Sequence, residues 1–246
     1  MYTLNNFMNN IKNEWHEIID EILNTSKEDK KEEEERKKLN ILLNTLIKEY
    51  NTDKSIEPSF ETIFDTFNEF QFNTLSVLIM YYRNENQDLR EQNILTELYD
   101  EYKYLIKIPR HKFIDNYNFN KLKNQGVLII NMCLTYSKNN PQLHMNLWHL
   151  FMPKIITEIN KRQKYVIYLL WDQKLNPVMI EIKKGENDTT KKKTADEKRK
   201  IISYLILQAE SLPRGKFNRF KGCNHFIIAN HFLKNWHKPL IDWISI

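Results

Sequence analysis

Apolar residues recur along the chain with two different periods, which separate predicted helices from predicted strands. Apolar residues three or four positions apart mark amphipathic helices over residues 4–24 and 39–50. Short aliphatic runs at 75–80, 127–130 and 165–171 have the length and composition of buried strands. Runs that are apolar on both faces are typical of a parallel sheet lying under helices. The pattern therefore predicts an α/β fold.

The run at 127–130 is the stretch around which the rest of the chain is organised. It follows Gly126 and ends in the polar residue Asn131. In open α/β sheets ligands bind beyond the carboxyl ends of the strands, so Asn131 stands where a ligand contact is expected. The alternative is that Asn131 only forms the turn, because asparagine is a common turn residue.

The polar stretches predict further elements. Alternating acidic and basic residues at 27–38 indicate the solvated start of a second helix, with a capping signal at Ser26–Asp29. Residues 137–146 are expected to form a loop, followed by a helix that begins at Trp148 and ends near Lys161. A basic connection covers residues 183–200 and includes Lys191, Lys192 and Lys193. We expect a helix from about Thr194 whose buried side carries Ile201, Ile202, Leu205 and Ile206.

Composition narrows the class of protein. With 246 residues the chain suits one large domain, in which a helical segment (1–50) packs on an α/β domain (51–246). No apolar run is long enough to span a membrane. Two cysteines favour a reduced, intracellular protein, although a disulfide stays open. Because metal-ligand spacings and a glycine-rich phosphate loop are both missing from the sequence, we expect no metal and no cofactor.

Three blocks of sequence point to a known family. Residues 125–135 read Gln-Gly-Val-Leu-Ile-Ile-Asn-Met-Cys-Leu-Thr, residues 148–151 read Trp-His-Leu-Phe, and residues 222–243 contain Gly-Cys-Asn-His-Phe and Pro-Leu-Ile-Asp-Trp. Over residues 60–243 the chain resembles the family-one uracil-DNA glycosylases. The resemblance implies a three-layer α/β/α fold, with a short, mostly parallel four-stranded sheet and additional N-terminal helices. It also implies a base pocket in which Asn131 reads a flipped-out uracil, with Tyr81 and Tyr82 beside it.

The same resemblance locates the catalytic positions and shows them changed. The family's Gly-Gln-Asp-Pro-Tyr-His loop falls on residues 81–86, where this chain reads Tyr-Tyr-Arg-Asn-Glu-Asn. Arg83 thus replaces the family's aspartate, Asn86 the last histidine of that loop, and Glu210 the uracil-binding histidine.

Bond cleavage requires negative charge near the sugar and hydrogen-bond donors on the departing uracil. An arginine at the aspartate position removes an attraction and adds a repulsion, each of order 4 kcal/mol at ~4 Å and an effective dielectric near 20. We therefore expect that no catalytic residue is retained. The alternative is an active, divergent glycosylase in which Glu85 or Asp88 supplies the anion.

A basic and aromatic segment is the candidate DNA contact. It comprises Arg214, Lys216, Phe217, Arg219 and Lys221, at the position of the family's wedge loop, with Lys191, Lys192 and Lys193 as further candidates. Basic side chains contact phosphates and aromatic rings stack on bases, so we expect DNA as the partner. The alternative is a solvated, charged loop.

The resulting hypothesis is a DNA-binding protein that does not excise uracil. A role in viral DNA replication or repair, with a possible protein partner, would place it in the nucleus or in a cytoplasmic viral factory. One rival is an active glycosylase. The other is a protein-interaction scaffold that binds through residues 26–50 and does not contact DNA.

Overall fold

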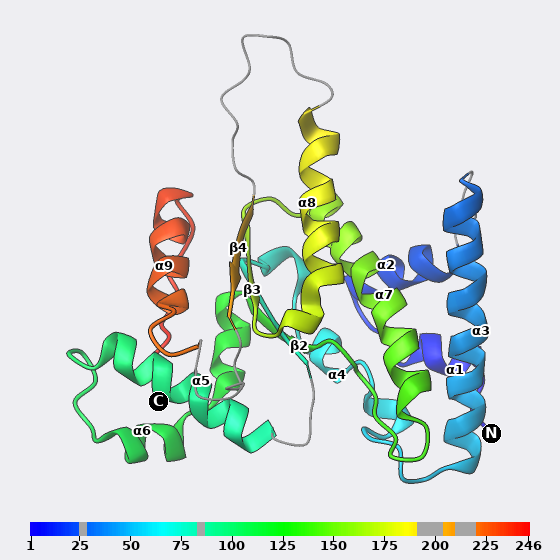
Figure 1. Cartoon of the computed structure of the whole chain (residues 1–246), viewed down its shortest axis with the longest axis horizontal. Helices are drawn as coiled ribbons and strands as arrows, with labels where there is room; N and C mark the ends of the chain where they lie inside the picture. Colours follow the sequence, from blue (N-terminus) through cyan, green and yellow to red (C-terminus); the bar gives the residue numbers. More distant parts are fainter. Residues whose placement is uncertain (25–28, 83–86, 191–203, 210–219) are drawn as a thin grey trace. The chain divides into compact units, whose positions relative to one another are not determined.

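The computed structural model describes residues 1–24, 29–82, 87–190, 204–209 and 220–246 (Figure 1). The chain divides into two compact units. One comprises Met1–Asn73, Met132–Gln163 and Pro177–Lys192, and the other comprises Thr74–Asn131, Lys164–Asn176 and Lys193–Ile246. The boundary expected from the sequence near residue 50 stays a prediction. Within the described ranges, no helix combines the length and apolarity needed to cross a bilayer.

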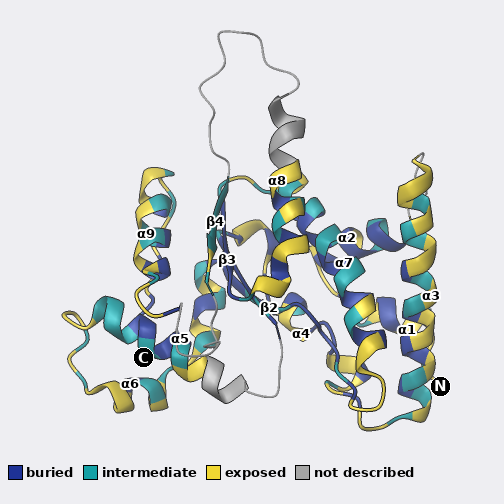
Figure 2. Ribbon diagram, in the orientation of Figure 1, coloured by how far each residue is buried: buried dark blue, intermediate teal, exposed yellow. Residues whose placement is uncertain are grey.

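The first unit is helical. Its elements, with those that end at its borders, are α1 (Leu4–Asn9), α2 (Glu14–Asn24), α3 (Lys30–Thr52), η1 (Phe60–Thr62), α4 (Asp65–Asn68), η2 (Phe72–Thr74), α7 (Pro141–Arg162) and α8 (Asn176–Thr190). Buried positions recur along one side of α3, which packs on α7 (Figure 2). These are the apolar residues Leu39, Leu43, Leu46, Ile47 and Tyr50.

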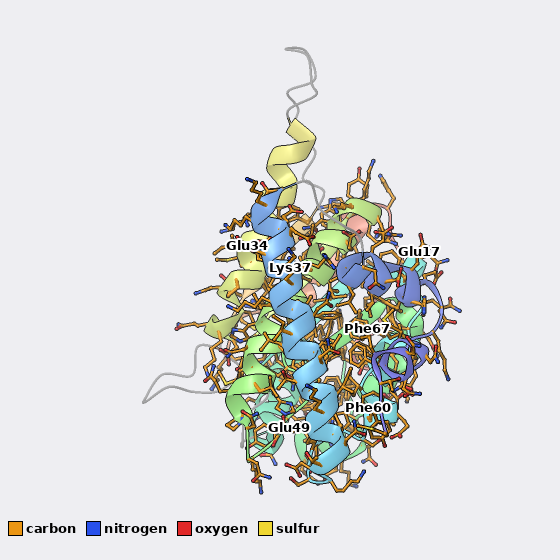
Figure 3. The ribbon with its side chains drawn as sticks, turned by 90° about the vertical axis from the view of Figure 1, so that its right-hand side faces the viewer. Glu17, Glu34, Lys37, Glu49, Phe60 and Phe67 are labelled. Atoms are coloured by element: carbon orange, nitrogen blue, oxygen red, sulfur yellow. The ribbon has the colours of Figure 1, made fainter. Side chains whose placement is uncertain are left out.

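The charged start of α3 is the solvated helix face that its sequence predicts. Asp29 caps the helix, because its side chain accepts hydrogen bonds from the backbone N–H groups of Lys31 (2.8 Å) and Glu32 (3.1 Å). Glu34 and Lys37 are exposed in the same half of the helix (Figure 3).

The second unit contains the sheet. Its strands are β1 (Val77–Tyr81), β2 (Val127–Asn131), β3 (Val166–Leu170) and β4 (Tyr204–Gln208), in the order β2-β1-β3-β4. All three strand pairs are parallel. The expected α/β class and the four-stranded sheet are therefore confirmed, and the sheet is wholly parallel.

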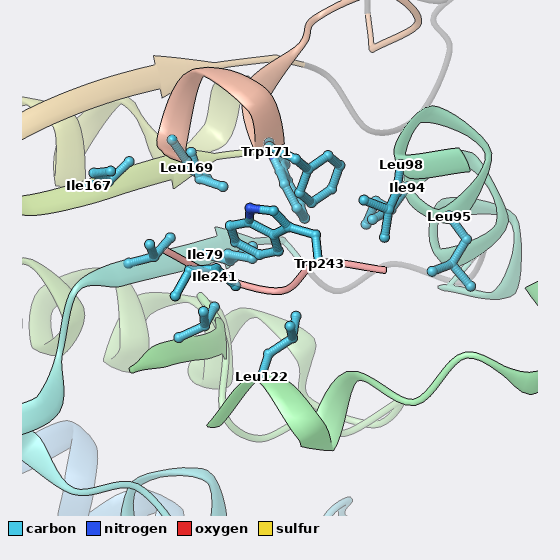
Figure 4. Close-up of a cluster of buried hydrophobic side chains, with 14 of the residues drawn as sticks. Ile79, Ile94, Leu95, Leu98, Leu122, Ile167, Leu169, Trp171, Ile241 and Trp243 are labelled. Carbon is cyan, nitrogen blue, oxygen red and sulfur yellow. The ribbon is translucent and has the colours of Figure 1, made fainter. Parts of the chain in front are cut away.

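Burial on both faces explains why the strands read as unbroken aliphatic runs. In β1, Val77 and Ile79 point to one face, Leu78 and Met80 to the other, and all four are fully buried. The face of Val77 and Ile79 packs against α5 (Gln87–Tyr102), α6 (Arg110–Asn116), η3 (Phe119–Gln125), α9 (His225–Asn235) and the C-terminal tail. Figure 4 shows Trp171 and Trp243 at the centre of this hydrophobic cluster.

Two helix boundaries differ from the sequence-based expectation. The predicted helix at 4–24 is two helices, since Asn10 and Asn13 break it: the Asn10 side chain donates to the Phe60 carbonyl, and Asn13 has a φ of 59°. The loop expected at 137–146 is wrong beyond residue 140, because α7 begins at Pro141. Proline suits a first helical position, which needs no backbone N–H.

The largest error concerns residues 204–208. The sequence predicts a helix here, with Leu205 and Ile206 on its buried side, but these residues form β4. A short apolar run does not by its periodicity distinguish a strand from a buried helix. Ile201, Ile202 and the helix start near Thr194 lie outside the described residues. The N-terminal part of the expected basic connection belongs to α8.

Gly126, which precedes β2, allows a direct test of backbone strain. Its φ is +82°, and an added Cβ would lie 2.4 Å from the Thr74 carbonyl oxygen. Gly222 has a similar φ, +78°, but nothing lies within 4 Å of its added Cβ. We expect Gly222→Ala to cost about 1 kcal/mol from the left-handed backbone alone. Gly126→Ala should cost at least about 2 kcal/mol more, because the β1 entry must also move. Urea denaturation of the two variants measures the difference, and equal losses of stability would contradict the close approach.

Candidate functional site

The carboxyl ends of β1 and β2 bring together two residues that the sequence singled out. Tyr81 is the register partner of Asn131. Paired residues of neighbouring strands point to the same face, so both side chains lie on the face that carries Ile79. Tyr81 and Asn131 are half-buried, and Tyr81 packs against the hydrophobic cluster. A phenol ring therefore stands directly beside the candidate base-reading asparagine.

Tyr82, the third expected pocket residue, lies under a lysine. Its side chain is only 5% exposed, and the Lys174 Nζ lies 4.5 Å from its ring centre. Lys174 is held there by η4 (Gln173–Leu175), whose cap is Asp172: the Asp172 carboxylate accepts from the Lys174 backbone N–H at 2.8 Å. An ammonium over an aromatic face is an attractive pair. The edge formed by the ends of β1 and β3 thus carries a cation.

The buried Trp171 and His225 form a structural hydrogen bond. Trp171 Nε1 donates to His225 Nδ1 at 3.0 Å, and an indole N–H can only donate. His225 therefore accepts at Nδ1 and carries its proton on Nε2. Burial lowers the pKa of His225 to about 4, so the ring is neutral at pH 7. His225 is therefore a hydrogen-bonded histidine of the core.

A second polar row lies in the first unit and has the residue types of a nucleophilic triad. Trp148 Nε1 donates to Thr135 Oγ1 (2.7 Å), which leaves the Thr135 hydroxyl to donate to His144 Nδ1 at 2.6 Å. The His144 Nε2 then faces Glu49 Oε2 at 3.5 Å. Thr135 is 0% and His144 1% exposed, so no substrate reaches this hydroxyl. The row is a buried network that fixes the core.

Two carboxylates of α5 bind the start of α9. Glu97 accepts from the backbone N–H groups of Gly222 (2.7 Å) and Asn224 (3.3 Å), and Glu101 accepts from that of Ile227 (2.9 Å). Ligand atoms of Glu97, Glu101 and Cys223 lie within 4.8 Å of one another, the arrangement in the described residues that could hold a metal ion. Burial raises the pKa of the Cys223 thiol to about 12, which disfavours the thiolate that a metal requires. Cys133 and Cys223 are both free.

Comparison with known proteins identifies relatives named uracil-DNA glycosylase. No protein-family profile matches the chain. The uracil-DNA glycosylase of Fusobacterium nucleatum is 30% identical over 152 residues, which cover 61% of this chain and 57% of that protein. The Escherichia coli O7:K1 enzyme of the same name is 28% identical over 139 residues, or 56% and 52% of the two chains. The chain thus spans about half the length of the curated relatives it matches.

Solved structures agree with the fold. Mimivirus UNG Y322L in complex with UGI has a TM-score of 0.68 at 15% identity, covering 98% of this chain and 91% of that one. Mimivirus uracil-DNA glycosylase has a TM-score of 0.56 at 17% identity, covering 83% and 80%. The chain thus has the fold of these uracil-DNA glycosylase structures and resembles uracil-DNA glycosylases in sequence over 56–61% of its length.

Several positions singled out by the family resemblance lie outside the described residues. They are the altered catalytic positions Arg83, Asn86 and Glu210, and the candidate DNA contacts Arg214, Lys216, Phe217, Arg219, Lys191, Lys192 and Lys193. Lys221 is described and exposed, next to the Gly222 turn. The roles expected for all of these residues stay predictions.

The site residues predicted from the sequence did not include Lys174 or Glu101. An aspartate directly after an apolar strand, as at Asp172, is a turn-capping signal that could have drawn attention to Lys174. Glu97 and Glu101 are four residues apart, a spacing that places both carboxylates on one helix face.

Two buried tryptophans of the cluster test the Trp171–His225 bond. In the described part of the chain, Trp243 Nε1 has no hydrogen-bond partner, whereas Trp171 Nε1 has His225. Both replacements by phenylalanine remove the same volume. Only Trp171→Phe leaves a buried acceptor unsatisfied, so it should destabilise by about 1–3 kcal/mol more than Trp243→Phe. Chemical denaturation compares the two, and a larger loss of stability in Trp243→Phe would show that the bond contributes little.

Proposed function

We propose that this chain is a DNA-binding protein with the uracil-DNA glycosylase fold that does not excise uracil. The observation that carries the proposal is the pair of tyrosines at the end of β1. By the family resemblance a glycine and a glutamine stand at these positions. Here Tyr81 is in register with Asn131 and half-buried against the core, where it competes for the space that a flipped base would need. Tyr82 is buried beneath Lys174.

The sign of the charge at this edge supports the same conclusion. Cleavage of the glycosidic bond develops positive charge on the sugar, which a nearby anion stabilises and a cation opposes. Lys174 places an ammonium at the ends of β1 and β3, and the sequence puts Arg83 at the family's aspartate position. Asp172 is the nearby described carboxylate, and it is engaged in capping η4. The edge is therefore better suited to a phosphate than to an oxocarbenium ion.

DNA as the ligand is supported by charge and by relationship. The chain carries a net charge of +5, and the basic segment that ends at Lys221 supplies side chains that contact phosphates. The curated relatives bear the name uracil-DNA glycosylase, which implies a DNA substrate for them. A role as an accessory of viral DNA replication or repair belongs to this proposal.

An active, divergent glycosylase is the second candidate. The names of the relatives favour it, and so does Asn131, which stands at the end of β2 as the family resemblance requires. Its catalytic anion would have to come from Glu85 or Asp88, since Arg83 cannot serve.

Incubation with a uracil-containing single strand distinguishes the two candidates. We expect the strand to remain intact after alkali treatment, because Arg83 replaces the family's aspartate and Lys174 adds a cation where the oxocarbenium-like sugar would need an anion. The same mixture, run on a native gel, should show DNA retarded by bound protein. This control excludes the explanation that the strand stays intact only because the protein does not bind it. Scission at uracil that disappears in Asn131→Ala would establish the active enzyme instead.

Charge reversal tests the DNA contact. Substituting glutamate at Arg214, Lys216, Arg219 and Lys221 should weaken binding to strands of any sequence, since phosphate contacts carry no base information. It should also reduce the slope of log affinity against log salt by roughly three, because each phosphate that the protein ceases to neutralise on a single strand lowers that slope by about 0.7.

The matched control reverses four exposed lysines of α3: Lys30, Lys31, Lys37 and Lys38. Filter binding should give it nearly the wild-type affinity. An equal reduction of affinity in both variants would assign the effect to net charge rather than to the basic segment. If the wild type binds no DNA even at low salt, the scaffold role gains support.

A further inference from the structure

The start of α9 is attached to α5 through two acidic side chains that lie one helical turn apart. Glu97 is 3% exposed and uses both carboxylate oxygens on backbone N–H groups of the turn at Gly222–Asn224. Glu101 uses Oε2 on the Ile227 N–H. Its other oxygen, Oε1, is buried and has no hydrogen-bond partner in the described part of the chain. The two residues together form what we call the α5–α9 contact.

The lysine beside this contact is Lys221, which directly precedes the Gly222 turn and is exposed to solvent. In the described residues, no lysine or arginine forms an ion pair with either carboxylate. The facing titratable groups are Tyr102 from α5, Cys223 from the turn and His225 from α9. Their pKa values lie near 12, 12 and 4, so all three are uncharged at pH 7. The amide groups of the first turn of α9 are what favours an anion here.

We propose that Glu101 is a proton-dependent attachment point: with a proton on Oε1 it holds the first turn of α9 on α5, and loss of that proton loosens the turn. A neutral Glu101 still accepts the Ile227 hydrogen bond at Oε2. Glu101 is half-buried, with Oε1 turned inward, so an ionised Glu101 places a second negative charge beside the buried carboxylate of Glu97, and the two like charges repel. The attachment operates in the free protein and does not depend on DNA binding.

The direction of the pH effect follows from proton linkage. Burial, followed by the charge of Glu97, raises the pKa of Glu101 from 4.5 to about 7. A turn that has opened exposes Glu101 to water and returns it to its ordinary pKa. Between about pH 4.5 and 7 the closed state therefore holds more protons than the open state, and raising the pH favours opening. Lys221 directly precedes the Gly222 turn, so opening would release the backbone next to a candidate DNA contact; this consequence alone rests on the proposed function.

His225 titrates in the opposite sense and must be separated from Glu101. Burial depresses the pKa of its ring to about 4, so an open or unfolded state binds more protons than the closed one as pH falls below 6.5. The two slopes oppose each other between pH 4.5 and 6.5. The total stability of the wild type would therefore hide the Glu101 effect, and the experiment needs a matched variant.

The experiment is amide hydrogen exchange at Asn224 and Ile227 from pH 5 to 8, corrected for intrinsic exchange, in wild type and Glu101→Gln. Glutamine keeps the acceptor for Ile227 but does not titrate. The exchange rates give an equilibrium constant for opening of the turn in each variant. The ratio of this constant in the wild type to that in Glu101→Gln should rise by up to about tenfold per pH unit between pH 5 and 7, and then level off. The control is Glu91→Gln, an exposed residue on the same helix, which should follow the wild type.

A constant ratio between wild type and Glu101→Gln across this range would overturn the proposal. So would a ratio that changes equally for Glu91→Gln. If Glu101→Gln does not fold, NMR titration of carboxyl-labelled glutamates in the wild type decides. An apparent pKa near 7 for Glu101 supports the attachment, and one near 4.5 refutes it.

Discussion

Parallel pairing of β1 with β2 and β3 is the constraint on which the rest of the second unit depends. Parallel strands run in one direction, so each must be connected to the next by a long crossover, and their carboxyl ends all meet at one edge. The central strands β1 and β3 are buried on both faces, which leaves that edge and the segments after it as the place where polar side chains gather. Tyr81 lies beside Asn131, and Lys174 lies over the ring of Tyr82, for this reason.

In the described part of the second unit, acidic and basic side chains occupy different places. Glu97 and Glu101, two acidic groups of α5, face backbone amides of the α9 start. The edge of the sheet instead presents the ammonium of Lys174, supported by Asp172. Hydrogen bonds between carboxylates and backbone N–H groups stabilise one arrangement of the two helices. The acidic residues of α5 therefore have a structural role, and the positive charge lies at the sheet edge.

The sequence predicted those features that depend on local pattern. Buried strands read as unbroken aliphatic runs, so β1, β2 and β3 were located to within about two residues. β4 was not, because this edge strand is only half-buried and Leu205 and Ile206 follow Ile201 and Ile202 at helical spacing in the sequence. The adjacency of Tyr81 and Asn131 follows from register, which a family resemblance supplies. Glu101 and Ile227 are 126 residues apart, and nothing in either local sequence predicts that one bonds the other.

In the described residues the pairing of β1 with β2 ends at Tyr81 and Asn131, so Tyr82, which follows β1, lies outside the ladder that holds the sheet together. The contacts that stabilise the fold are therefore made by other residues than those that determine the chemistry at the sheet edge. The segment after β1 can therefore change in sequence without disturbing the strands, the buried Trp171–His225 bond or the C-terminal tail. Overall similarity then reports on the framework, and only the few residues at the strand ends bear on the chemistry of the edge.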